Sequence, residues 1–87
     1  MEYIVERDKI YVENERGNVI AEVTFPQTGS GVQTIDHTYV DSSLRGQGVA
    51  GELVKRAVET IKANGNEVRA TCSYAIKWLS ENKESNI

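Results

Sequence analysis

Alternating apolar and polar residues in the first part of the chain predict an antiparallel meander. Residues 9–13 and 19–25 both alternate, after a short extended lead-in at residues 3–5, and the turn-forming residues 14–18 separate them. The second of these strands should carry on one face Val19, Ala21, Val23 and Phe25. A polar loop, residues 26–31, then leads into a third predicted strand, residues 32–40. Its alternation is expected to place on one face Ile35, His37 and Tyr39, and on the other Asp36, Thr38 and Val40.

After Gly48 the apolar residues recur with the period of a helix, up to residue 61, and Asn64-Gly65 is a typical stop signal. Residues 67–71 are predicted to form a further strand. A final helix over about residues 73–82 should place inward Ile76 and Leu79, with Ala75 beside them. Because strand–helix–strand units are right-handed crossovers with parallel strands, the chain is predicted to be α+β: an antiparallel meander, a crossover and a closing C-terminal helix.

Length and charge narrow the classes of protein that fit. With 87 residues the chain is expected to form one domain over residues 1–87, with a loose tail at 81–87. Ten basic and thirteen acidic residues argue against a nucleic-acid partner. One cysteine excludes an internal disulfide, and no apolar run suggests a leader or a membrane span. We therefore expect a cytoplasmic protein without a membrane partner and without a metal site.

A glycine-rich turn at residues 45–51 joins the third predicted strand to the first helix. Glycines let the backbone approach a ligand, and the first N–H groups of a helix have no intrahelical partner, so the turn suits an anion such as pyrophosphate. Gly46-x-Gly48-x-x-Gly51 is formally the dinucleotide-binding fingerprint. A dinucleotide fold begins with that turn and ends its second strand in an acid. Here the turn lies mid-chain and the next strand ends at Thr71-Cys72-Ser73, so this interpretation is rejected.

Arg45-x-x-Gly48-x-Ala50 resembles the coenzyme A signature of the GNAT (GCN5-related) superfamily of N-acetyltransferases. His37-Thr38-x-Val40 and Thr71-Cys72-x-Tyr74 resemble its very small single-domain branch, and the resemblance runs from about residue 9 to residue 82. It implies a compact fold with splayed central strands and acetyl-CoA held in the gap between them. The implied coenzyme-binding residues are Tyr39, Val40, Arg45, Gly46, Gln47, Gly48, Val49, Ala50 and Gly51.

Acetyl transfer to an amine needs a base for the amine and an acid for the departing thiolate. His37, the only histidine, is the candidate base, or else it bonds a backbone carbonyl or supports Cys72. Cys72 could accept the acyl group, or it could only line the site while the amine attacks the thioester directly. We favour direct transfer. Cys72 could also be simply a small buried hydrophobic residue. In the superfamily a tyrosine of the closing helix protonates the thiolate, but Leu79 takes that place here. Tyr74 or Ser73 could substitute, or the thiolate could leave unassisted or through water, and Tyr74 could instead cap the core.

The sequence therefore predicts an acetyl-CoA-dependent N-acetyltransferase that acts on an unidentified primary amine by direct attack in a ternary complex. The superfamily's two helices that wall one side of the amine site are replaced here by the turn at residues 14–18. The acceptor site should thus be open, compatible with a small or protein-borne amine, or with a second subunit in a homo-oligomer. Two alternatives stay open: a non-catalytic acyl-CoA-binding module, and an interaction domain that has lost the ligand, against which the three glycines argue.

Overall fold

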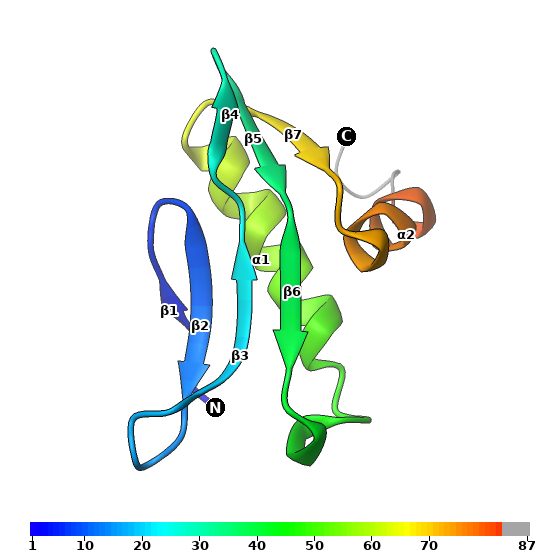
Figure 1. The fold of residues 1–87 in the computed structure, drawn as a ribbon. Coiled ribbons are helices and arrows are strands. Elements are labelled where there is room, and N and C mark those ends of the chain that lie inside the picture. Colours follow the sequence, from blue (N-terminus) through cyan, green and yellow to red (C-terminus); the bar gives the residue numbers. More distant parts are fainter. Residues whose placement is uncertain (83–87) are drawn as a thin grey trace.

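Two small sheets and two helices make up the computed structural model, which describes residues 1–82 (Figure 1). The first sheet is antiparallel and has the order β1 (Ile4–Val5), β2 (Lys9–Glu13), β3 (Val19–Thr24), β6 (His37–Val40). The second has the order β4 (Gln27–Gly29), β5 (Val32–Ile35), β7 (Glu67–Ala70), with β5 and β7 parallel. The helices are α1 (Val49–Ala63) and α2 (Ser73–Glu81). The predicted α+β arrangement of meander, crossover and closing helix is confirmed.

The core lies between α1 and the inner faces of the strands. The apolar stripe of α1 is buried as its periodicity predicts, and it packs against alternate residues of β2 and β3 and against Phe25, which directly follows β3. These core residues are Ile10, Val12, Ala21, Val23, Phe25, Val49, Leu53, Val54, Ala57, Val58 and Ile61. Val19, expected on the same face, is instead 41% exposed, because the β2–β3 register shifts between Val12 and Glu13.

The long third strand that the sequence predicts is interrupted at Asp36. The prediction that Ile35, His37 and Tyr39 share one face of the sheet is therefore wrong. Ile35 ends β5 and is fully buried, whereas both His37 and Tyr39 of β6 are exposed. At the interruption the Asp36 carboxylate accepts a 2.5 Å hydrogen bond from Thr24 Oγ1. One residue outside both strands reverses the alternation. It also transfers the chain from the second sheet to the first.

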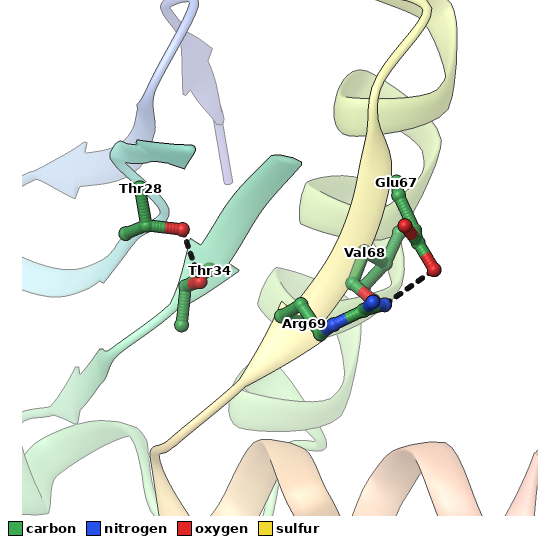
Figure 2. Close-up of polar contacts among 5 residues, drawn as sticks. All are labelled: Thr28, Thr34, Glu67, Val68 and Arg69. Carbon is green, nitrogen blue, oxygen red and sulfur yellow. Dashed lines mark hydrogen bonds and ion pairs between the residues drawn. The ribbon is translucent and has the colours of Figure 1, made fainter. Parts of the chain in front are cut away.

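The loop predicted at residues 26–31 contains a short strand, β4, which pairs with β5. Figure 2 shows the Thr28 and Thr34 hydroxyls in contact between β4 and β5; their oxygen atoms are 2.6 Å apart. On β7 of the same sheet, Arg69 forms an exposed ion pair with Glu67 (Figure 2). An exposed ion pair of this kind contributes little to stability, so the sheet depends on its backbone ladder and on the side chains buried beneath it.

Gln33 is the buried polar centre of this region, with only 1% of its surface exposed. Its Nε2 donates to the carbonyls of Phe25 (2.9 Å) and Arg7 (3.1 Å). Its Oε1 accepts from the side-chain amides of Asn64 (2.9 Å) and Asn66 (2.8 Å). One side chain therefore joins the N-terminal hairpin to β5 and to the turn between α1 and β7.

The closing helix α2 contacts the core through Ala75, Trp78 and Leu79. The prediction that Ile76 points inward is wrong, since that residue is 50% exposed. The face of α2 that meets the core is centred on Ala75, with Trp78 and Leu79 on either side, and residue 76 lies about 100° around the helix from that centre, at the edge that faces solvent. Of the loose tail predicted at 81–87, Glu81 ends α2 and residues 83–87 lie outside the described residues. Within residues 1–82, no helix has the length and apolarity needed to cross a membrane.

Candidate functional site

The two central strands separate after Ile35, and a cleft opens where they diverge. In Figure 1, β6 continues in the direction of β5, whereas β7 turns aside to reach α2. The cleft has a volume of about 700 Å³. It is lined by Thr38, Tyr39, Val40, Leu44, Arg45, Gly46, Gly48, Val49, Ala50, Gly51 and Tyr74. Arg45 is the only charged side chain in this lining, so the charge of the lining is positive.

The turn that leads from β6 into the cleft is held by Asp41. Its carboxylate accepts hydrogen bonds from the Ser43 hydroxyl (2.6 Å) and the Ser43 backbone N–H (3.0 Å), and so caps the short 3₁₀ helix Ser42–Leu44. These two bonds from Ser43 hold the pKa of the Asp41 carboxyl below its usual range. The chain is thereby ordered before Arg45, where the lining of the cleft continues.

Gly46 and Gly48 have a left-handed backbone, with φ of 83° and 74°. Such a conformation is easily adopted only by glycine. A Cβ at either position would meet no other part of the described chain within 4 Å, so it would project into open space. Gly48 is also the N-cap of α1, and no side chain caps the helix there. The N–H groups of the first turn of α1 are therefore available to an anion.

Gly51, in the first turn of α1, allows α2 to approach closely. A Cβ at residue 51 would lie 3.4 Å from Tyr74 Oη and 3.7 Å from Trp78 Nε1. The Tyr74 hydroxyl is thus held against the first turn of α1 at the wall of the cleft. A hydroxyl donor therefore lies at the wall of the cleft, and the catalytic role of Tyr74 stays a prediction.

Cys72 is the half-buried N-cap residue of α2, and its Sγ lies 3.5 Å from Thr38 Oγ1. It is not part of the cleft lining, but it contacts the lining through Thr38. Burial raises the pKa of the Cys72 thiol. The Thr38 hydroxyl and the backbone amides of Ala75, Tyr74 and Thr38 favour the thiolate more strongly, so the pKa lies below its ordinary value.

The lowered pKa predicts that Cys72 reacts with iodoacetamide at a lower pH in the native protein than in the unfolded chain. Thr38→Val removes the hydroxyl at nearly constant volume and should move the native reaction profile to higher pH. Because the folded-state pKa is the lower one, the thiolate stabilises the fold above the unfolded pKa, and this contribution is lost as pH falls through the folded pKa. Alkylation rates followed by mass spectrometry across pH test this. Identical profiles for native, unfolded and Thr38→Val protein would contradict it.

The remaining predicted site residues lie outside the cleft lining. His37 is exposed at the start of β6, where it pairs with Thr24, and alternation places it on the face opposite Thr38. Gln47 is exposed between the two lining glycines. The structure adds Thr38 and Leu44 to the lining, which were not among the predicted site residues. Thr38 could have been assigned from alternation once the interruption at Asp36 was known.

Comparisons with known proteins show which family the chain resembles. The family model for GCN5-related N-acetyltransferases matches residues 9–86. Protein NATD1 of Homo sapiens and of Mus musculus are each 29% identical over 62 residues, which is 71% of this chain and 55% and 56% of those proteins, respectively. The chain thus spans about half the length of the curated relatives it matches.

Two solved structures show the same fold. A GCN5-like protein of Staphylococcus aureus is 34% identical, with a TM-score of 0.73, over 98% of this chain and 82% of that one. The GNAT family protein YhbS of Escherichia coli, crystallised with CoA, is 24% identical, with a TM-score of 0.62, over 71% of this chain and 38% of that one. The chain therefore belongs to the GCN5-related N-acetyltransferase family, which uses acetyl-CoA.

Proposed function

We propose that this chain binds acetyl-CoA in the cleft and transfers the acetyl group to a primary amine. The observation that carries the proposal is the backbone around Gly46 and Gly48. Two left-handed glycines with open space above them precede a helix whose N-terminus no side chain caps, and Arg45 adds a positive charge. Oriented N–H groups, the positive end of a helix dipole and a guanidinium together suit a pyrophosphate.

The edge of β6 that faces the cleft is suited to hold the rest of the coenzyme. β6 is the last strand of its sheet, so its outer edge has no ladder partner within residues 1–82. Backbone groups at Tyr39 and Val40 can therefore bond the amide groups of a pantetheine arm, as the family resemblance implies. Acetyl-CoA supplies the activated thioester, and the chain positions it between β6 and α2.

The proton transfers are assigned to residues on two sides of β6. His37 is exposed on the side opposite Thr38, where an acceptor amine can reach it, and we assign it to take the proton of the attacking amine. The Tyr74 hydroxyl at the cleft wall is assigned to donate to the departing thiolate. Cys72 lies behind Thr38 and supports the site without being acylated. This is direct transfer, in which the amine attacks the bound thioester.

Calorimetric titration with acetyl-CoA and intact-protein mass spectrometry test the proposal together. We expect saturable binding of one coenzyme per chain, no change in protein mass in the absence of amine, and turnover in a screen of primary amines. Cys72→Ala should retain both binding and turnover. A stoichiometric acetyl adduct that is absent from Cys72→Ala and moves to added amine would instead show a covalent route. Binding without turnover on any amine would indicate a non-catalytic module, and absence of binding would refute the proposal.

A further inference from the structure

The face of the first sheet that points away from α1 carries a carboxylate beside an exposed aromatic ring. In β3 the buried Ala21 and Val23 point toward α1, so Glu22 between them points to the opposite face. The β3–β6 register places Tyr39 directly opposite Glu22, and Tyr39 is 41% exposed. Directly opposed side chains on one sheet face have Cβ atoms about 5 Å apart. Glu22 and Tyr39 are thus neighbours on an open surface.

No charged partner neutralises Glu22 in the described part of the chain. The two ion pairs there join Arg56 to Glu52 and Arg69 to Glu67, and no hydrogen bond reaches the Glu22 carboxylate. On β2, Tyr11 lies directly opposite Glu22, and its ring already has the Lys9 ammonium over it, 5.4 Å from the ring centroid. The ring of Tyr39 has no cation over it in residues 1–82. The Tyr39 hydroxyl donates to Asp41 Oδ1 (3.4 Å), which leaves the face of its ring open. The half-buried residue Glu22 and this ring face together form a site for one cation.

We propose that Glu22 and Tyr39 bind the non-reacting ammonium group of the acceptor, and that this acceptor is a small aliphatic diamine. The inference rests on the proposed function and deepens it. The attacking nitrogen must be neutral, so a site that favours a positive charge fits a second nitrogen of the same molecule. Tyr39 also lines the cleft, so a molecule held at Glu22 lies beside the edge of β6 to which the proposed function assigns the thioester.

Spacing favours a short diamine as the molecule bound at this site. Neighbouring strands are about 4.8 Å apart, so a cation at Glu22 on β3 lies roughly 5–10 Å from the outer edge of β6. An aliphatic chain of a few methylenes spans this distance. The same face also carries the exposed Glu13, farther along β2, together with the Lys9 ammonium and the exposed His37. Glu22 is the carboxylate directly opposite Tyr39, so one ammonium is matched at this position.

The test compares cadaverine with n-pentylamine, which has the same chain and no second amino group, and with a lysine-containing peptide. In the wild-type protein with acetyl-CoA, cadaverine should have the highest kcat/KM of the three. Glu22→Gln should raise KM for cadaverine roughly tenfold with kcat nearly unchanged, and leave n-pentylamine unaffected. Glu13→Gln, which removes an exposed carboxylate further along β2, is the matched control and should change neither. Equal use of the two amines, preference for the peptide, or an unaltered KM in Glu22→Gln would overturn the inference.

A binding measurement separates this inference from the proposed function. Cadaverine titrated into the protein without coenzyme should shift the Tyr39 ring resonances in NMR spectra saturably, and Glu22→Gln should abolish the shift. If acetyl-CoA does not bind but this shift is seen, the proposed transferase function fails and the cation site stands. If acetyl-CoA binds and no saturable shift is seen, the cation site is refuted and the coenzyme site stands.

Discussion

Gly48→Asn is expected to weaken acetyl-CoA binding by at least about a hundredfold while the protein remains folded. Asparagine is among the residues that adopt a left-handed backbone most readily, so the φ of 74° at this position costs it little. Its side chain projects into the open space that the cleft offers above Gly48. Loss of two hydrogen bonds to charged phosphate, each contributing ~1.5–3 kcal/mol, accounts for a change of this size. Calorimetric titration measures the affinity, and chemical denaturation confirms the fold.

Gly31→Asn provides the matched control for that substitution. Gly31 has a φ of 71°, and a Cβ there would also meet nothing within 4 Å, but it lies in the turn between β4 and β5, outside the cleft lining. Placing asparagine in a left-handed backbone should therefore cost the two variants a similar free energy of folding. Only the variant at residue 48 should lose the coenzyme. Unchanged affinity in Gly48→Asn, or equal losses in both variants, would show that the glycine turn does not bind acetyl-CoA.

Gln33→Leu is expected to lower the free energy of unfolding by about 2–4 kcal/mol. The leucine is similar in size but leaves the Phe25 carbonyl without its 2.9 Å donor in a buried position. It also removes the acceptor that the side-chain amides of Asn64 and Asn66 share. Several polar groups would lose partners at once, which explains why the expected cost exceeds that of one hydrogen bond. Urea denaturation followed by circular dichroism measures the change.

Gln27→Leu makes the same chemical change at an exposed position of β4. Gln27 bonds the carbonyl of Gly29 and accepts from Asn66, but water can replace these partners because the residue is exposed. We expect a change within about 0.5 kcal/mol. Equal destabilisation by the two substitutions would show that the network around Gln33 does not join the N-terminal hairpin to the rest of the fold.

Local pattern was sufficient for most elements of this chain. The apolar stripe of α1 and the turn at Gly48 depend on residues within a few positions of one another, so period and glycine content identify them. The closing helix shows the limit of such reasoning. Its existence was predicted, and Ala75 and Leu79 contact the core as expected, but the direction of Ile76 depends on which side meets the core, and packing places Trp78 there instead of Ile76.

The sequence by itself determined the α+β order of elements and the glycine turn, and its resemblance to a known family indicated the coenzyme. Only the tertiary structure decided which side chains meet across the strands. The interruption at Asp36 turns Thr38 toward Cys72 and His37 outward, and the β3–β6 register sets Glu22 beside Tyr39. Gln33 likewise has its partners up to 33 positions away along the chain. The reason is physical: a shift of one residue in a strand reverses every side chain after it, and long-range pairing selects the register.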